Sequence, residues 1–388
     1  MLFVLAPYNK QCTFAVAEEM GMQTTSLLEK ALNGQQLSFN EALFLYENAP
    51  LNVIMEAAHS RRMQMHPEKQ VGWIIDRNVN ITNICFSFCK FCNFCRKSSS
   101  EDGYITSLDE YRQKIHEMVK LGGDQLLLQG GMHPKLGLEF YVDLFSSLKK
   151  EFPSIKLHTL GPPEVVHIAK LAGISFRETL LRLQEAGMDS LPGAGAEILV
   201  DRVRKIVSPA KCNSDEWLDV MREAHKINLP TSATMMFGHV ETPAERIEHL
   251  MRIREVQDEV PKGHFGFLNF VPWPFMDEGT NLLTRHNISN QTNARDYIRL
   301  IAISRLILSN VPHIQASWLT VGQQTGQVCL HAGADDFGSI MIEENVVSSA
   351  GAHYKMDSDG IQQCIQDAGF KPARRNQRFE AFNSAQEK

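Results

Sequence analysis

Four cysteines stand close together in the stretch NITNICFSFCKFCNFC, at Cys85, Cys89, Cys92 and Cys95. The first three have the spacing C-x3-C-x2-C, and Phe91 directly precedes the third. Three thiolates on one loop can bind three irons of a cubane cluster and leave the fourth iron open for an external ligand. The spacing therefore favours an open iron–sulfur cluster.

The competing interpretation is a structural zinc site with Cys95 as the fourth ligand, although such sites usually use two separated pairs of ligands. An electron-transfer ferredoxin uses C-x2-C-x2-C-x3-C with remote partners on a small fold, and neither feature fits this chain. The other cysteines, Cys12, Cys212, Cys329 and Cys364, are scattered singly. We interpret these four as small buried or half-buried residues.

The composition is that of an ordinary globular protein, with 388 residues, 43% hydrophobic and 22% charged. A net charge of −6 and a pI near 6.2 argue against a general nucleic-acid binder. No segment approaches the roughly 20 apolar residues of a membrane span. The opening MLFVLAP is too short for a signal peptide, lacks a basic start and is broken by Pro7. We therefore expect a cytosolic protein, where clustered cysteines are more often metal ligands than disulfides.

Strand-like and helix-like runs alternate along the chain after a helical preface at about residues 24–64. Ser38 with Glu41, and Ser107 with Glu110, have capping-box spacing at expected helix starts. The expected strands are 72–80, 124–131, 155–160, 189–199, 230–239, 265–273 and 313–319. The expected barrel helices are 107–123, 138–152, 162–173, 175–187, 214–227, 244–260 and 294–308.

Seven or eight such units predict a closed (β/α)8 TIM-type barrel, with a doubly wound open sheet as the weaker alternative. We expect residues 1–70 to be a helical extension packed on the barrel. Residues 71–355 are expected to form the barrel, and 356–388 a C-terminal helix and polar tail. No repeat or long linker indicates independent domains.

Barrel enzymes place their chemistry at the carboxyl ends of the strands. The residues with chemical potential fall at such positions: Gln129, Gly130, Gly131, Met132 and His133 after the second strand, His158 ending the third, Gly193, Gly195 and Glu197 after the fourth, Gly238, His239 and Glu241 after the fifth, Trp273 ending the sixth, and Gln315, Ser317 and Trp318 on the seventh. One barrel mouth could gather all of them.

The pattern C-x3-C-x-(aromatic)-C after the first strand of a barrel resembles the signature of radical S-adenosylmethionine (SAM) enzymes. The blocks DRNVNITNIC, LLLQGGMHP, PGAGAEILVDRVR, ATMMFGHVETPAERIEHL, IQASW and DDFGSIMIEENVVSSAG closely resemble the cyclic dehypoxanthinyl futalosine synthase family of menaquinone biosynthesis. The resemblance covers residues from about 25 to 375. Residues 1–22 match nothing in the pattern and are interpreted as an extension or an upstream start. Cys95 falls at a non-ligand position and is expected to be a bystander.

The resemblance implies a [4Fe–4S] cluster held by Cys85, Cys89 and Cys92, with SAM on its open iron. It implies the oxidative cyclisation of dehypoxanthine futalosine, in which a 5′-deoxyadenosyl radical takes the ribose C4′ hydrogen and the sugar radical adds to the benzoate ring. Reduced flavodoxin or ferredoxin is the expected electron donor. The sibling aminofutalosine synthase is the alternative, and the forms QGG and TMMFGH favour the cyclase.

The same resemblance implies roles for the cofactor-binding candidates Phe91, Gln129, Gly130, Gly131, Glu197 and Arg204. Phe91 would pack against the cluster and adenine, and the QGG segment would hold the methionine amino group with close backbone approach. Glu197 would accept from the ribose hydroxyls or the ammonium, and Arg204 would pair with the methionine carboxylate. The alternative for Glu197 and Arg204 is a surface ion pair between neighbouring helical turns.

The proton lost from the ring radical needs a base, and His133, His158 and His239 are the candidates. For each of them the alternative is a hydrogen-bonding wall residue. The benzoate carboxylate should meet a cation or strong donor, and the sequence leaves several choices open: Arg77, Ser317 and Gln315. Trp273 and Trp318 could wall off the sugar radical or simply pack in the core.

Overall fold

The computed structural model describes residues 10–381, with side chains from residue 19 onward. The opening stretch MLFVLAP, residues 382–388 and the side chain of Cys12 lie outside the described part of the chain. The strands are β1 (Gln70–Ile74), β2 (Asp76–Asn80), β3 (Gln125–Gln129), β4 (Lys156–Thr159), β5 (Thr231–Phe237), β6 (Phe267–Pro274), β7 (His313–Ile314), β8 (Asp336–Ser339) and β9 (Lys371–Arg374). All of their pairings with one another are parallel.

The strands close into a barrel. The sheets have the orders β2-β3-β4, β5-β6-β7 and β8-β1-β9, and β1 runs directly into β2. Isolated parallel bridges fill the gaps: His158 with Ser190, Leu191 with Thr231, and Gln315 with Asp336. The predicted (β/α)8 barrel is thus confirmed, and the open sheet is excluded.

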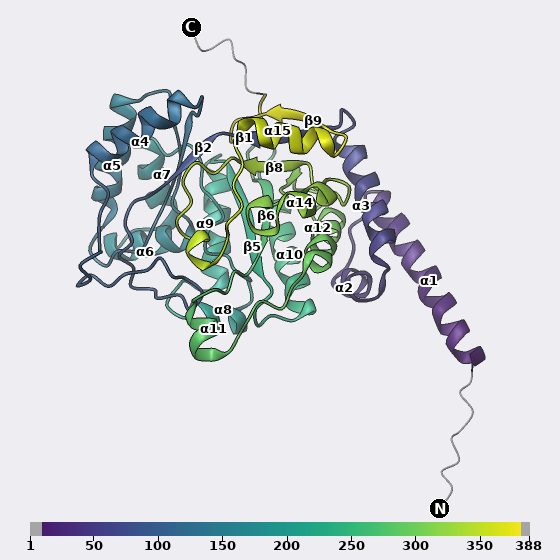
Figure 1. Cartoon of the computed structure of the whole chain (residues 1–388). Helices are drawn as coiled ribbons and strands as arrows, with labels where there is room; N and C mark the ends of the chain where they lie inside the picture. Colours follow the sequence, from purple (N-terminus) through teal and green to yellow (C-terminus); the bar gives the residue numbers. More distant parts are fainter. Residues whose placement is uncertain (1–9, 382–388) are drawn as a thin grey trace, which may run out of the picture.

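Helices surround this barrel (Figure 1). They are α4 (Leu108–Lys120), α5 (Leu138–Glu151), α6 (Pro162–Ala172), α7 (Phe176–Glu185), α8 (Asp201–Val207), α9 (Ser214–Lys226), α10 (Pro243–Asp258), α11 (Asn281–His286), α12 (Ala294–Ile307), α13 (Trp318–Val321) and α14 (Gln323–Leu330). The predicted capping box of Ser107 and Glu110 is present at the start of α4. Cys212, Cys329 and Cys364 are buried, as expected for core residues.

The chain begins with α1 (Lys10–Leu32), α2 (Phe39–Asn48) and α3 (Leu51–Met65), which lie on one side of the barrel in Figure 1. The capping box of Ser38 and Glu41 starts α2, as predicted. Arg299 of α12 donates to the carbonyl oxygens of Tyr46 and Ala49, at 3.0 and 2.8 Å. The N-terminal helices therefore pack on the barrel helices through buried backbone carbonyls as well as apolar contacts.

The C-terminal part differs from the sequence prediction. The helix α15 (Ser358–Asp367) is present, but the expected polar tail contains β9, which pairs with β1. The strand β8 was also not predicted from the sequence. Long strands were predicted at 189–199 and 313–319. The structure has only the Ser190 and Leu191 bridges in the first range and the two-residue β7 in the second. Short segments such as DFGS and KPAR lack the apolar alternation by which a strand is recognised.

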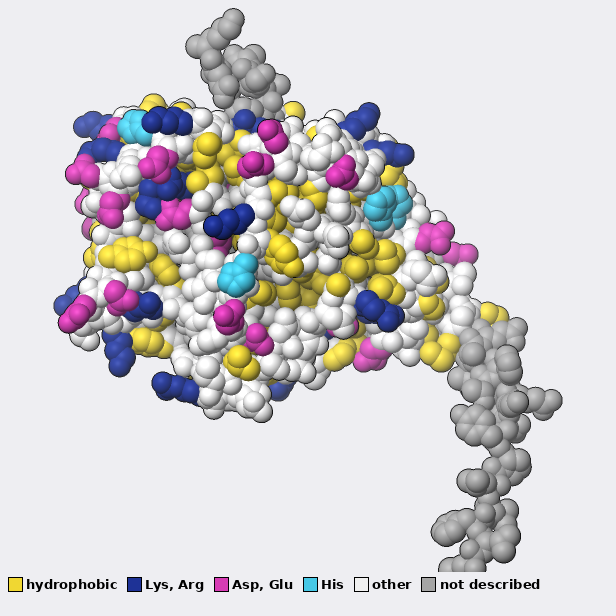
Figure 2. All heavy atoms as spheres, in the orientation of Figure 1, with side chains coloured by type: hydrophobic (Ala, Val, Ile, Leu, Met, Phe, Trp, Pro, Cys, Tyr) yellow, Lys and Arg dark blue, Asp and Glu magenta, His cyan; other side chains and the backbone are white. Residues whose placement is uncertain are grey.

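The surface view in Figure 2 shows hydrophobic side chains gathered across the middle of one face, over β5, β6 and neighbouring helices. Lys and Arg side chains are interspersed with Asp and Glu around them, so this face has no continuous basic stripe. Among the described residues, no helix combines the length and apolar character needed to cross a membrane.

A buried network of charged side chains connects helices and strands at the N-terminal end of the barrel. Asp335, which precedes β8, is paired with the fully buried Arg305 of α12. The other carboxylate oxygen lies 2.5 Å from His313 Nδ1 and 3.2 Å from His66 Nε2. Burial alone would raise the pKa of Asp335, but Arg305 and His313 outweigh it and lower the pKa. The network joins α3, α12, β7 and β8.

We predict that Asp335→Asn lowers the free energy of unfolding by about 3–5 kcal/mol, because it leaves the Arg305 guanidinium buried without a counter-charge. Urea unfolding followed by circular dichroism measures this loss. Arg182→Gln is the matched control, because it breaks the exposed pair with Glu139 and should leave the unfolding midpoint nearly unchanged. Equal losses in the two variants would contradict the structural role of Asp335.

Candidate active site

A cavity of about 390 Å³ lies inside the barrel and reaches from the cysteine loop to the opposite end of the strands. The residues that line it include Cys85, Cys89, Phe91, Cys92, Cys95, Gln129, Gly130, Gly131, His158, Glu164, Glu197, Lys211, Trp273, Gln315, Ser317, Trp318, Arg375 and Gln377. The cavity thus gathers most of the residues expected at a barrel mouth. Three of the sequence-predicted site residues do not line it: His133, His239 and Arg204.

The cysteine loop connects β2 to α4 and is tied by backbone hydrogen bonds to two neighbouring elements. The Phe86 amide donates to the carbonyl of Met132 after β3, at 3.1 Å, and the Lys90 amide donates to Val207 at the end of α8, at 2.9 Å. Phe88, between the first two cysteines, has a φ of +45°, which is uncommon for a bulky residue. These ties hold the loop over the mouth of the barrel.

Gly130 and Gly131 allow a close approach between the end of β3 and the cysteine loop. A Cβ atom on Gly131 would lie 2.3 Å from the carbonyl oxygen of Ile84, and one on Gly130 would lie 2.9 Å from that of Thr82. The Gly131 amide also donates to the Thr82 carbonyl at 2.7 Å. The two glycines therefore let the cysteine loop itself approach the end of β3, and the close backbone approach is to protein rather than only to ligand.

The thiols of the loop have different acidities. A hydrogen bond from Cys95 is the main cause that lowers the pKa of Cys85 to about 6, whereas the pKa of Cys95 is raised by the same contact. Burial raises the pKa of Cys89 and Cys92. Cys95 also lies 3.2 Å from the carbonyl oxygen of Cys85. In this arrangement the Cys95 thiol donates toward Cys85.

A zinc site needs its thiolates closer together than the structure places them. Four sulfurs at 2.3 Å from one zinc ion lie about 3.8 Å from one another. Among the described residues, the groups of three or more side chains with ligand atoms within 4.8 Å of one another do not include any of these cysteines. The structure therefore does not bring three or more of these thiols to the mutual distances of a zinc site.

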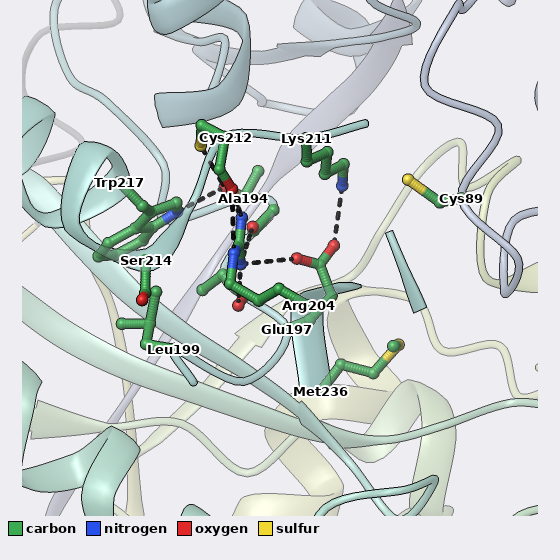
Figure 3. A network of polar contacts seen from close by, with 12 residues as sticks. Cys89, Ala194, Glu197, Leu199, Arg204, Lys211, Cys212, Ser214, Trp217 and Met236 are labelled. Carbon is green, nitrogen blue, oxygen red and sulfur yellow. Dashed lines mark hydrogen bonds and ion pairs between the residues drawn. The ribbon is translucent and has the colours of Figure 1, made fainter. Parts of the chain in front are cut away.

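Glu197 lies beside the cysteines, where Figure 3 shows its carboxylate between Lys211 and Arg204. It is almost fully buried, and its φ of +43° is a strained conformation of the kind that gathers at functional sites. Burial alone would raise the pKa of Glu197, but Lys211 and Arg204 lower it. Glu197 is therefore a carboxylate that faces the cavity.

The structure does not bring Arg204 to the cofactor position predicted for it. Its guanidinium donates to the carbonyl oxygens of Gly195, Ala196 and Cys212, at 2.6–3.0 Å, and contacts Glu197 at 3.3 Å. The alternative of a surface ion pair is also wrong, because both side chains are buried. Arg204 instead holds the glycine-rich loop in place (Figure 3).

Lys211 is the cation at this end of the cavity, and the sequence analysis missed it. Its Nζ lies 2.8 Å from Glu197 Oε1 and 5.4 Å from the centre of the Phe91 ring. Burial opposes its protonation, but Cys89 and Glu197 outweigh that effect and raise its pKa. Figure 3 shows the Cys89 sulfur on the same side of Glu197 as Lys211. A single lysine between two helices carries no sequence signal that could have found it.

Glu164 is a second missed residue. Its carboxyl group lies in the first turn of α6, and the Gly130 amide donates to it at 3.4 Å. Burial raises its pKa to about 8, so at neutral pH this group is mostly protonated and can donate a hydrogen bond into the cavity. No motif marks Glu164 in the sequence, because an acidic residue after two prolines at a helix start is also common as an ordinary first-turn acid.

The candidate bases differ in their surroundings. His158 lines the cavity, with Nδ1 at 2.7 Å from Ser190 Oγ, and burial lowers its pKa to about 3. His239 is enclosed by its own segment, with Nε2 at 3.0 Å from the Met236 carbonyl oxygen and Nδ1 at 2.8 Å from the Val240 amide. The Nδ1 atom of His133 accepts from the amide of Lys135.

The residues considered for binding the substrate carboxylate differ in whether they line the cavity. Arg77 faces away from the cavity, because its guanidinium pairs with Glu117 at 2.6 Å and Glu343 at 3.0 Å. Gln315 and Ser317 line the cavity, although Ser317 Oγ donates to a backbone carbonyl at 2.8 Å. Trp273 and Trp318 both line it, as expected for walls.

Comparisons with known proteins agree with this fold and site. Residues 79–253 match the model of the Radical SAM superfamily, and residues 264–388 match the CofH/MqnC C-terminal region. Methylornithine synthase (PylB) superposes with a TM-score of 0.69 at 19% identity, covering 90% of this chain and 97% of that one. The hydrogenase maturase HydG superposes with a TM-score of 0.72 at 14% identity, covering 94% and 80%. The fold and the cysteine motif define a radical SAM enzyme.

Curated relatives show which family within the radical SAM class this chain belongs to. Cyclic dehypoxanthine futalosine synthase of Streptomyces coelicolor is 43% identical over 91% of this chain and 88% of its own. The protein of the same name from Halalkalibacterium halodurans is 39% identical over 95% and 97%. Aminodeoxyfutalosine synthase of Thermus thermophilus is 36% identical over 84% and 86%. The chain belongs to the radical SAM family that contains these futalosine synthases.

Enzymes of this class use a [4Fe–4S] cluster and SAM, and the residues present fit both groups. Cys85, Cys89 and Cys92 line the cavity, and the Gly130–Gly131 backbone leaves space for their loop. The buried Lys211 and Glu197 offer one cation and one carboxylate to a ligand that carries a carboxylate and an ammonium group.

We predict that Gly131→Ala lowers the iron bound after anaerobic reconstitution, because the added methyl group would displace the cysteine loop from the end of β3. Iron per chain and the cluster absorbance measure the effect. Gly137→Ala is the matched control, since a Cβ there meets nothing within 4 Å, and this variant should bind iron as the parent does. Full iron content in Gly131→Ala would refute this role of the glycine.

Proposed function

We propose that this chain catalyses the oxidative cyclisation of dehypoxanthine futalosine to cyclic dehypoxanthine futalosine in menaquinone biosynthesis. One observation carries the proposal: a 43% identical relative of that name matches over 91% of the chain. The cavity supports it, because thiols, aromatic walls and polar groups for a small molecule share one enclosed space. A small-molecule substrate is the natural occupant of such a cavity.

In this proposal Cys85, Cys89 and Cys92 bind the cluster, and Phe91 packs beside it. The cluster and SAM together supply the one-electron cleavage that generates a hydrogen-abstracting radical. Lys211 pairs with the carboxylate of SAM, and Glu197 accepts from its ammonium group or ribose hydroxyls. Gln129, Gly130 and Gly131 support this end of the cavity.

The proposal also assigns roles to the two tryptophans that line the cavity and to the base. Trp273 and Trp318 exclude water from the reacting carbon. We assign the base to His158, since among the three histidine candidates it is the one that lines the cavity. Its lowered pKa keeps the imidazole neutral at physiological pH. A neutral imidazole can accept a proton at Nε2, where the Gln377 side chain is its neighbour at 3.4 Å. A weak base suffices for the acidic proton of a ring that regains aromaticity.

The proposal also covers the electron donor, other binding partners and the cellular location. We infer a small reduced flavodoxin or ferredoxin as the electron donor, a cytoplasmic location and no nucleic-acid partner. The net charge of −6 supports the last inference. We also retain the division into a helical extension at 1–70, a barrel at 71–355 and a C-terminal part at 356–388, with β9 added to the last.

The deciding assay is anaerobic incubation of the reconstituted, reduced protein with SAM, with and without dehypoxanthine futalosine. Substrate-dependent 5′-deoxyadenosine, together with a product two hydrogens lighter than the substrate, is the expected result. Deoxyadenosine without that product would move the substrate to the aminodeoxyfutalosine synthase type. Absence of a cluster together with tightly bound zinc would remove the radical chemistry altogether.

We predict that Cys85→Ala, Cys89→Ala and Cys92→Ala each lose bound iron and all cyclising activity, because each removes one cluster ligand. Cys95→Ala is the matched control and should retain both, since Cys95 lies outside the C-x3-C-x2-C motif formed by the other three cysteines. Iron analysis and product formation are the measurements. Equal iron loss in all four variants would make Cys95 a ligand.

We predict that Lys211→Gln raises the KM for SAM about 10- to 100-fold, because it removes a charge-assisted hydrogen bond. Lys205→Gln, on the exposed side of α8, is the control and should leave this KM unchanged. Steady-state kinetics with saturating dehypoxanthine futalosine separate KM from kcat. An unchanged KM in Lys211→Gln would assign Lys211 to the stability of Glu197 alone.

A further inference from the structure

The floor of the cavity carries a second cation. Arg375 follows β9 directly, and its amide donates to the carbonyl of Trp73 in β1 at 2.9 Å. This anchor turns the side chain into the N-terminal end of the barrel, where it lines the cavity. Among the described residues that line the cavity, Lys211 and Arg375 are the only lysine or arginine side chains. Lys211 lies by the cysteine loop, and Arg375 lies by the start of β8.

Arg375 is held in one orientation. Its Nε and Nη2 atoms both donate to Asp336, and its guanidinium lies 3.8 Å from the centre of the Phe379 ring. Nη1 donates to the carbonyl of Asn376 at 3.2 Å. A guanidinium has five N–H donors, so among the described residues three have these partners. One N–H on Nη1 and one on Nη2 remain, and each can form a charge-assisted hydrogen bond to a carboxylate oxygen.

Polar side chains surround Arg375 at this end of the cavity. His158 is neutral at physiological pH because burial lowers its pKa. Burial raises the pKa of Asp76, whose carboxyl group is bonded to Ser339 and Gln125. Gln377 Nε2, from the same segment as Arg375, lies 3.4 Å from His158 Nε2. Among the lining residues at this end, Arg375 is therefore the cation that can meet a ligand carboxylate.

We propose that Arg375 binds the benzoate carboxylate of the substrate and thereby fixes the benzoate ring at the floor of the cavity. The inference rests on the proposed function. The ribose carbon that loses hydrogen must lie at the cysteine end, so the far end of an extended substrate reaches toward the floor. Arg77, the cation considered from sequence, faces away from the cavity, whereas Arg375 lines it. The cation therefore comes from the C-terminal region, outside residues 79–253 that match the radical SAM model.

The test compares dehypoxanthine futalosine with its benzamide analogue, in which a neutral amide replaces the carboxylate. Their binding to the anaerobically reconstituted protein with SAM is measured by titration calorimetry. We expect the parent protein to prefer the acid by at least about tenfold, as for loss of a charge-assisted hydrogen bond. In Arg375→Gln the preference should fall to about one, while Arg378→Gln, an exposed neighbour, should keep it.

A second variant guards against misfolding, because Arg375→Gln leaves Asp336 buried without its partner. The double variant Arg375→Gln with Asp336→Asn removes both charges and should show the same loss of preference. Circular dichroism identifies which variants fold as the parent does. Equal binding of acid and amide by the parent, or an undiminished preference in either folded variant, would overturn the assignment of Arg375. If the parent forms no cyclised product, the proposed function fails instead, which the assay with dehypoxanthine futalosine reveals separately.

Discussion

Neutralisation of buried charge is the constraint on which this barrel depends. Its interior is a cavity lined in part by ionisable groups, so each must find a partner or lose its charge. Glu197 is paired with Lys211 and Arg204, and Asp336 is paired with Arg375. Among the residues that the structure describes, Glu164 has no ion-pair partner, and its raised pKa keeps it mostly protonated at neutral pH. These pairings fix the loops and the C-terminal segment that complete the cavity.

The pairings also give the cavity two different ends. At the mouth, three thiols, Lys211 and Glu197 provide the groups that a cluster and SAM require. At the floor, Arg375 and His158 are held by β9 and its following residues on one side and by β4 on the other. A long substrate that spans these ends would have its reacting carbon and its carboxylate positioned by separate parts of the chain. Such positioning is the main contribution of a protein to radical chemistry.

The cysteine loop shows how the backbone limits the chemistry. Its three ligand candidates can face one cavity because Gly130 and Gly131 leave space for the Thr82–Ile84 backbone. The strained backbone conformation of Glu197 is maintained because Arg204 donates hydrogen bonds to the adjacent carbonyl groups of Gly195 and Ala196. Local strain of about 1–3 kcal/mol is stable only where surrounding hydrogen bonds enforce it. The site is thus built by contacts that are themselves far from the reacting atoms.

The sequence alone determined the barrel, the cysteine loop and the capping boxes of α2 and α4, because these depend on local spacing and periodicity. It also brought Phe91, Glu197, His158 and the two tryptophans to the cavity, since the ends of parallel strands must meet. Only the tertiary structure decided the roles of Arg204, Lys211 and Arg375. Whether a buried cation faces a cavity or a row of carbonyl groups depends on contacts between segments distant in the chain. No local pattern carries that information, so the strand β9 and the position of Arg375 directly after it could be recognised only in the folded molecule.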